Sequence, residues 1–358
     1  MVFRKKRILL LTSVAVLLVL MILDLTIKKE QLLESFSEPF FNEQRTDAFY
    51  LANRQAKATS ERQLEIERRE LKEVLLAGTG GKIAVERASG DTIRLHYTVT
   101  ATGADEEAAN RRLEAVKVEE EIGEGRLTLA AKSEDKPIDN DAVSIDYVLQ
   151  VPDGMKLRID NEEGTVHIAG IRGDVDADSY GGLMEVADVT GNVKVAASYG
   201  DLLLSGITGS IDLENLYGEA DIEQAKGDVT LMSRSGYTNM SGIEGKIAVD
   251  SENGSLHVRE TTGQVEVAGR ATAVQLEGIR GDMKITADSG YVKLILPQAE
   301  GYTLNAALTR SDIRTSLPVS VEREVQEDNM ERLTGVIGAG SRKVDIKAES
   351  AELVIHSK

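Results

Sequence analysis

The sequence contains no cysteine and no tryptophan, and aromatic residues make up only 4% of its 358 residues. Without cysteine, the chain can form no disulfide framework, no thiol nucleophile and no cysteine-ligated metal site. Positive charge is also scarce, because 42 lysines and arginines stand against 60 aspartates and glutamates, a formal net charge of −18. Phosphate contacts need clustered positive charge, so we expect no nucleic-acid partner.

The amino terminus carries a long hydrophobic run behind a basic cluster. Residues 1–7 include Arg-Lys-Lys-Arg, and the run from Ile8 to Ile27 is interrupted by one charge, Asp24. As a helix, this run would cover about 30 Å, the thickness of a bilayer core. We therefore expect a transmembrane anchor over 8–27, with residues 1–7 in the cytoplasm and the remainder of the chain outside the cell. A cleaved signal peptide is the alternative, although residues 28–31 offer no small-residue cleavage site.

Residues 28–80 are polar and mixed, and we expect them to form an extracytoplasmic stalk. Within them, Ser60–Leu76 is predicted to be helical, because Leu64, Leu71 and Leu75 would share one helix face and Ser60 could cap it. Whether such a helix dimerises as a short coiled coil stays open.

Residues 81–156 have the alternation of a small α+β lead-in that covers one end of the repetitive region beyond it. Strands are predicted over 91–101, 126–132 and 143–151, and a helix over 104–117.

Glycines then recur every 18 residues. A second series lies nine residues out of phase, at 164, 182, 200, 218, 236, 254 and 290, and it misses once at Thr272. Internal periods of this length indicate a repetitive stack, and the glycines are expected to occupy its turns. The first series consists of Gly173, Gly191, Gly209, Gly227, Gly245, Gly263 and Gly281.

Aliphatic residues stand two and four positions after nearly every one of these glycines, as Val193 and Val195 do after Gly191. Each nine-residue unit is therefore predicted to be a short strand with two inward residues. We predict an all-β chain whose centre, 157–317, is a single-stranded parallel β-solenoid of 18-residue coils. Residues 302–317 fit one more coil, and 318–358 are expected to hold a helical or loop insertion followed by terminal strands.

Three segments carry a family resemblance. They are Val151–Leu157 (Val-Pro-Asp-Gly-Met-Lys-Leu), Gly191–Val195 (Gly-Asn-Val-Lys-Val) and Gly281–Ile285 (Gly-Asp-Met-Lys-Ile). Over about residues 82–358 the chain resembles the bacterial putative-adhesin β-solenoid domains, long catalogued as a domain of unknown function. With its anchor, it is similar to membrane-anchored proteins encoded with cell-envelope stress operons of Gram-positive bacteria. The resemblance implies no established catalytic residue.

The four histidines are not expected to form a metal site. His167 and His257 face outward five coils apart, about 24 Å, and the others are His96 and His356. The Gly-Gly-x-Gly-x-Asp motif of calcium-binding rolls is missing, so we expect no metal and no cofactor. Loose divalent binding to the acidic surface stays open.

Carboxylates on adjacent coils, such as Asp160 and Asp178, fall at the spacing of a glycosidase pair. No long loop or aromatic residue flanks them to shape a sugar site, and no nucleophile–base pair is visible, so we expect no catalysis.

Tyr180, Tyr199 and Tyr217 precede turn glycines in successive coils, with Tyr180 one residue out of line. They could form an aromatic ladder that contacts a sugar face or a peptide. The alternative is packing at the turns, since tyrosine is often half-buried.

Together these features predict a membrane-anchored extracytoplasmic module for binding, scaffolding or sensing in the cell envelope. Its expected partners are the bilayer, through residues 8–27, and an envelope glycan or a membrane protein. A self-associating structural protein is the alternative, and a polysaccharide-acting enzyme is a weaker one.

Overall fold

The computed structural model describes residues 56–134, 138, 140–297, 301–317, 322–325 and 330–357. They belong to one folded unit, Lys57–Lys358. Within these ranges the chain forms strands β1 to β24 and a single helix, α3, so the prediction of an all-β fold is confirmed. The predicted tail, the predicted anchor and residues 28–55 of the predicted stalk lie outside the described residues. Residues 57–80 belong to the folded unit, so the prediction of a stalk is wrong there. In the part that is described, no helix has the length and apolar character needed to span a bilayer.

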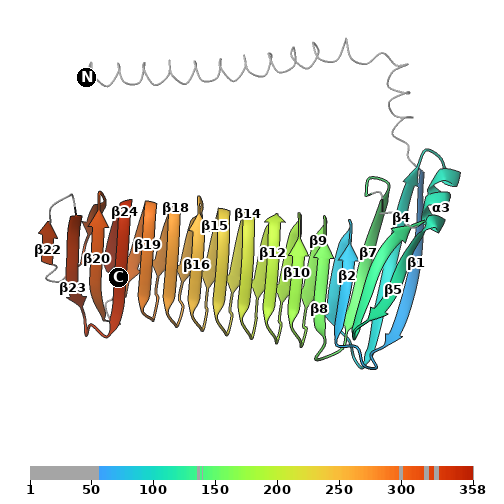
Figure 1. Ribbon diagram of the computed structural model, residues 1–358, viewed down its shortest axis with the longest axis horizontal. Helices are drawn as coiled ribbons and strands as arrows, with labels where there is room; N and C mark the ends of the chain where they lie inside the picture. Colours follow the sequence, from blue (N-terminus) through green and yellow to red (C-terminus); the bar gives the residue numbers. More distant parts are fainter. Residues whose placement is uncertain are drawn as a thin grey trace, which may run out of the picture. The chain divides into compact units, whose positions relative to one another are not determined.

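The centre of the unit is a stack of parallel strands in two rows, with successive strands side by side along the long axis (Figure 1). Row 1 contains β8 (Lys156–Asn161), β10 (Val175–Ser179), β12 (Val193–Tyr199) and β16 (Ile247–Glu252). Row 2 contains β9 (Thr165–Ala169), β11 (Leu183–Ala187), β13 (Asp201–Ser205) and β17 (Ser255–Arg259). The chain bends between each row 1 segment and the row 2 segment that follows it, and we call this bend the corner. Four longer strands continue through the corner and belong to both rows: β14 (Ile211–Glu223), β15 (Val229–Ser241), β18 (Val265–Glu277) and β19 (Met283–Leu296).

The pairing register in this stack advances by 18 residues. Val175 pairs with Leu157 on one side and Val193 on the other, and Leu183 pairs with Thr165 and Asp201 in the same way. Parallel neighbours of this kind place chemically similar side chains directly above one another. We use the word rung for one row 1 segment together with the row 2 segment that follows it.

The hydrophobic core runs between the two rows. The aliphatic residues predicted to face inward are buried, and in the first column of row 1 none is more than 2% exposed. That column consists of Leu157, Val175, Val193, Ile211, Val229, Ile247, Val265 and Met283. Stacked aliphatic columns thus build a dry core with few aromatic side chains.

At the amino-terminal end, an early segment is inserted into the stack. The strands β2 (Glu73–Gly78) and β3 (Lys82–Arg87) form a rung that pairs with β8 and β9 on one side. On the other side they pair with β6 (Arg126–Ser133) and β7 (Val143–Val151), which arrive later in the chain.

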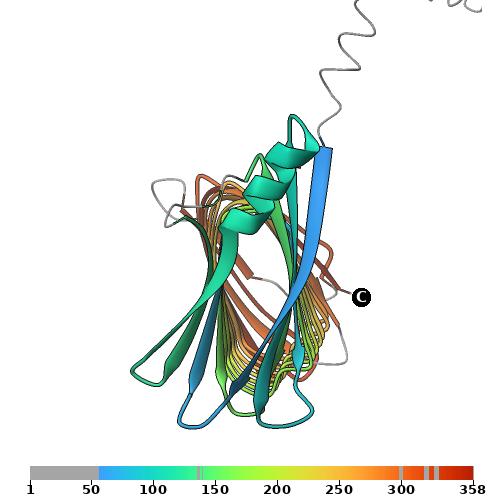
Figure 2. The same ribbon diagram turned by 90° about the vertical axis from the view of Figure 1, so that its right-hand side faces the viewer.

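The outermost layer at this end is antiparallel. It consists of β4 (Thr92–Gly103) on β7, β5 (Val116–Gly123) on β6, and β1 (Ala56–Glu67) on β4. Helix α3 (Glu106–Ala115) joins β4 to β5 and lies across the end of the stack (Figure 2). Asp105 caps it by accepting a hydrogen bond from the amide of Ala108. The strands and the helix predicted for the lead-in are therefore confirmed.

The helix predicted over Ser60–Leu76 is wrong. This segment forms most of β1 and β2, separated by a turn in which the Leu71 amide donates to the Arg68 carbonyl. Burial alternates along both strands, with Val74 and Leu76 fully buried. Because β2 is paired on both sides, tertiary pairing and a period of two override the helix-like spacing of the leucines.

The carboxyl-terminal end repeats the insertion. The last strand, β24 (Arg342–Ser357), lies between β19 and the rung made of β20 (Tyr302–Thr309) and β21 (Asp312–Thr315). Val344 accordingly pairs with Met283 and with Leu304. The segment expected to be helical or loop contains two antiparallel strands instead, β22 (Glu322–Val325) and β23 (Met330–Ile337), so a helix there is wrong. β23 pairs with β20.

Candidate functional site

The three tyrosines predicted to align do lie together, at the corner where the chain passes from row 1 to row 2. Tyr199 and Tyr217 are register partners. Their rings stack with centroids 5.1 Å apart and planes 8° apart. The Tyr180 ring packs edge-on against Tyr199 at 5.3 Å and 64°. We call these three residues the tyrosine stack.

Backbone pairing holds the tyrosine stack in line. The Tyr199 amide donates to the Tyr180 carbonyl (2.8 Å), and the Tyr180 amide donates to the Asn161 carbonyl (3.0 Å). On the inner side of the same corner, the buried Asn215 amide group donates to the Gly218 carbonyl (3.3 Å). The chain direction at each tyrosine is therefore fixed by hydrogen bonds on both sides of the corner.

The tyrosine stack is exposed, and one of its faces is open. Tyr180, Tyr199 and Tyr217 are 59%, 50% and 44% exposed. The next residue in the column after Tyr217 is the short side chain of Ser235, so no ring covers that face of Tyr217. A second aromatic side chain, Tyr237, lies two residues beyond Ser235 and is 68% exposed. Tyr237 is thus an exposed ring on the next rung, beside Glu219.

Sequence reasoning missed Tyr237. It directly follows Gly236, a position that points outward in every rung, and its pairing partner is Glu219. The glycine spacing therefore predicts that Tyr237 is exposed, and the register places it on the rung after Tyr217, next to Glu219.

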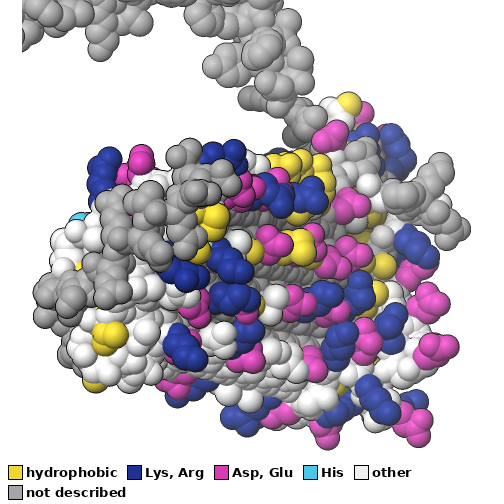
Figure 3. Space-filling model, turned by 60° about the vertical axis from the view of Figure 1, so that its left-hand side comes forward, with side chains coloured by type: hydrophobic (Ala, Val, Ile, Leu, Met, Phe, Trp, Pro, Cys, Tyr) yellow, Lys and Arg dark blue, Asp and Glu magenta, His cyan; other side chains and the backbone are white. Residues whose placement is uncertain are grey.

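Acidic side chains accompany the tyrosines. Asp201 and Glu219 each stand two residues after a stack member, and an Asp201 carboxylate oxygen accepts a hydrogen bond from the Glu219 amide (3.2 Å). Elsewhere on the surface, charges of both signs lie intermixed, as Figure 3 shows for one face. Many of them pair across rungs, such as Glu266 with Lys246 (3.3 Å).

The pKa directions of these surface carboxylates follow their partners. Hydrogen bonds from Lys284 and Lys246 hold the pKa of Glu266 below its usual range. Partial burial raises the pKa of Asp178, and the neighbouring Asp176 adds to the effect. The Arg158 guanidinium pairs with Asp178 at 3.4 Å.

The Asp160–Asp178 carboxylates are register partners, as their spacing predicted. Asp178 is the member with the raised pKa, the direction a general acid needs. It is nevertheless engaged by Arg158, and both aspartates stand on the outer side of regular strands. The geometry shows charge pairing along the stack.

The histidines are separate surface residues. The Nδ1 atom of His167 lies 3.0 Å from a Glu185 carboxylate oxygen, and Nδ1 of His356 lies 2.9 Å from the Ser316 hydroxyl. Burial lowers the pKa of His257. Across the described ranges, no group of three histidine or carboxylate side chains is placed to hold a metal ion.

The predicted turn glycines lie directly before the row 1 strands of their rungs. A Cβ atom on any of them would come within 3.0 Å of a carbonyl oxygen of the preceding rung. The seven are Gly173, Gly191, Gly209, Gly227, Gly245, Gly263 and Gly281.

The fold and surface first define a class: a repetitive all-β protein whose parallel rungs are capped at both ends. Residues 146–355 match the Toastrack DUF4097 family, which covers more than half of the chain, so the chain belongs to that family. The predicted resemblance to a family of domains of unknown function is thereby confirmed. The family name carries no enzymatic activity.

Three solved structures are similar to the chain. A putative cell adhesion protein from Clostridium sporogenes is 9% identical, with 84% of this chain and 100% of that chain covered and a TM-score of 0.20. A putative adhesin from Parabacteroides distasonis is 12% identical, with 83% and 97% covered and a TM-score of 0.32. A putative adhesin from Bacteroides fragilis is 12% identical, with 84% and 98% covered and a TM-score of 0.25. A comparison of the sequence with curated proteins found no match.

Proposed function

We propose that this chain is a membrane-anchored, extracytoplasmic β-solenoid of 18-residue coils that acts as a binding module in the cell envelope. The basic cluster and the apolar run of residues 8–27 support the anchor and its orientation. Membership of the Toastrack family supports the solenoid. The observation that carries the binding role is the exposed tyrosine stack.

The ligand class that fits this surface best is a glycan. A sugar ring presents an apolar C–H face that can lie on the open face of Tyr217, above the short Ser235 side chain. The carboxylate of Glu219, which follows Tyr217 by two residues, is an acceptor for sugar hydroxyl groups. Tyr237, an exposed ring on the next rung beside Glu219, is a second aromatic contact for a glycan longer than one sugar.

The binding role is tested on an array of bacterial cell-wall glycans with the full-length protein. Tyr217→Ala is expected to weaken binding about tenfold, because stacking and buried apolar area are lost together. Tyr237→Ala should cause a smaller loss.

Tyr291→Ala is the matched control. It occupies the position of Tyr237 relative to its own turn glycine, three rungs away. An equal loss of binding in the control, or unchanged binding of Tyr217→Ala, would contradict the proposed site.

The location is tested by adding protease to intact protoplasts. Residues 82–358 should be degraded without lysis of the cell. Degradation only after lysis would disprove the extracytoplasmic orientation.

A further inference from the structure

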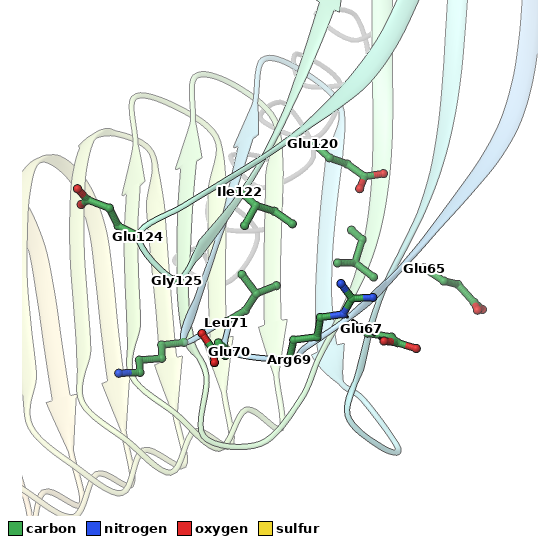
Figure 4. Close-up of a pocket in the computed structure, with 11 residues that line it drawn as sticks. Glu65, Glu67, Arg69, Glu70, Leu71, Glu120, Ile122, Glu124 and Gly125 are labelled. Atoms are coloured by element: carbon green, nitrogen blue, oxygen red, sulfur yellow. Dashed lines mark hydrogen bonds and ion pairs between the residues drawn. The ribbon is translucent and has the colours of Figure 1, made fainter.

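A groove of about 1230 Å³ opens at the amino-terminal end of the stack, between β5 and the turn that follows β1. Its apolar lining, which we call the floor, consists of Ile66, Leu71 and Ile122. Figure 4 shows Leu71 and Ile122. We call it the N-terminal groove. The N-terminal groove lies at one end of the stack, and the carboxyl-terminal strands lie at the other. No residue of the tyrosine stack lines the groove.

The groove exists because one core-facing side chain, Ile122, is left uncovered in the second half of β5. Val116 and Val118 face inward and are buried. Glu120 and Ile122 follow on the same side of the strand but are exposed, Ile122 by 62%. A core-facing isoleucine with most of its surface in water is a site where apolar burial is still available.

Arg62 lies where the contact between β1 and the rest of the outermost antiparallel layer ends. Its guanidinium joins β1 to β5 and helix α3 by donating to the carbonyls of Val116 (2.6 Å) and Leu113 (3.3 Å). Beyond this bridge, among the described residues, β5 pairs only with β6 and β1 only with β4. Each strand therefore presents one unpaired edge, which is a template for another strand.

The rim of the N-terminal groove is acidic, with five carboxylates and two cations lining it. Glu67 pairs with Arg69 (3.3 Å). Within the described part of the chain, Glu70, Glu120 and Glu124 have no ion-pair partner. Lys72 also lines the groove and, among the described residues, has no ion-pair partner. Three carboxylates against one ammonium leave the unpaired charge next to the apolar floor net negative.

We propose that the N-terminal groove binds an extended basic segment of a partner protein, which adds as a strand to the free edge of β5. Alternating side chains of such a segment fit both features of the site. Apolar side chains pack mainly on Ile122, beside the buried Leu71 and Ile66. The basic side chains lie near Glu70, Glu120 and Glu124. A second copy of this end would bring like charge against like charge, and an anionic lipid surface would be repelled in the same way.

The test uses a fluorescein-labelled eight-residue peptide of alternating lysine and valine, matched in length to β5. Binding to the full-length protein is followed by fluorescence anisotropy at physiological salt, where charges beyond about 8 Å are screened. We expect saturable binding. A peptide with glutamate in place of lysine should not bind, and methylation of alternate backbone amides should abolish binding, because strand addition requires those donors.

Variants at neighbouring positions of β5 distinguish binding in the groove from nonspecific attraction of the basic peptide to the acidic surface. Ile122→Ser and Glu120→Lys should each weaken binding about tenfold, through lost apolar contact and reversed charge. Glu121→Lys, which has the same charge change on the opposite side of β5, should have less than a twofold effect.

Four outcomes would overturn the proposal. They are no binding of the lysine peptide, equal binding of the methylated peptide, an equal loss with Glu121→Lys, or a groove occupied by a second copy. The last would appear as a dimer by light scattering that Ile122→Ser dissociates. None of these outcomes bears on glycan binding by the tyrosines.

Discussion

The spacing of the rungs makes a sharp prediction about the turn glycines. Gly227 has φ of +145°, a backbone conformation that side chains rarely adopt. An added Cβ atom would lie within 3.0 Å of the Gly209 carbonyl oxygen. To relieve this overlap, the turn at Gly227 would have to move towards the next rung, where the Gly227 amide donates to the Glu244 carbonyl at 2.9 Å. The turn cannot move freely in that direction, because it is hydrogen-bonded to the rungs on both sides.

The cost of Gly227→Ala can be estimated from its parts. Steric overpacking costs roughly 1–3 kcal/mol, the unfavourable φ about 1 kcal/mol, and one or two weakened ladder hydrogen bonds about 1 kcal/mol each. We therefore expect the free energy of unfolding to fall by about 3–6 kcal/mol. Gly170→Ala is the control, because Gly170 also has a positive φ (+70°) but no atom within 4 Å of its added Cβ. It should cost about 1 kcal/mol.

Urea denaturation of the full-length protein, followed by far-UV circular dichroism, measures both variants. Amide hydrogen exchange at Gly245 and Ile247, in the next rung, would locate the damage. If Gly227→Ala loses no more stability than Gly170→Ala, the rungs are not held at a spacing that requires glycine, and steric crowding is not the reason for the glycine repeat.

Three further perturbations address the ends of the stack. Tyr147 is buried and its hydroxyl has no partner among the described residues, so Tyr147→Phe should raise the free energy of unfolding by about 1 kcal/mol in thermal or urea melts. Burial raises the pKa of Tyr147, so the unfolded chain loses this proton first and wild-type stability should fall above about pH 10, a decline that Tyr147→Phe reduces. Arg62→Met removes the guanidinium bonds to Val116 and to helix α3 and should cost about 1.5–3 kcal/mol by the same melts, with no loss contradicting the bridge. Deletion of residues 342–358 removes the strand between β19 and β20 and should give aggregates in size-exclusion chromatography with light scattering, whereas a monodisperse monomer would show that β24 is dispensable.

The regular part of the fold was predictable because one physical pattern repeats in it. Each rung needs two inward aliphatic residues per strand and a glycine at a crowded corner, so the same spacing recurs in the sequence. Val193, Val195 and Gly191 illustrate this, and the two valines are buried as their positions predicted. The strands of the lead-in were also recognisable, because alternation within one strand is a local signal.

The two ends could not be predicted in the same way, because their pairing is not local. β2 lies between β6 and β8, and β24 lies between β19 and β20. The leucine spacing in Ser60–Leu76 suits a helix when considered alone. Only the strands on both sides of β2, which come from later in the chain, make the extended form the one that buries Val74 and Leu76.

The candidate surfaces likewise include residues that could be predicted from the sequence repeat and residues that could not. The tyrosine stack follows the 18-residue register, so its alignment could be predicted from spacing. Tyr237 could not be recognised as a site residue, because its neighbour Glu219 is known only from the pairing register. Ile122 could not be recognised either, because its exposure depends on where the outer antiparallel layer ends.

Inserting a distant segment at each end has a mechanical consequence. In a simple stack, the terminal rung is held by one neighbour and by its local chain connection, so it frays first. Here the rung of β2 and β3 is paired on both sides, and so is β24. Opening the amino-terminal end therefore requires β6 and β7 to leave before β2 can, although β2 precedes both in the chain. The ends are closed by long-range pairing. Because long loops must close before these pairs form, we expect the pairing at the ends to form late in folding. We infer that the central rungs form first and that the two inserted segments lock the stack afterwards, which leaves the strand edges beyond them, including that of β5, as the sites open to other chains.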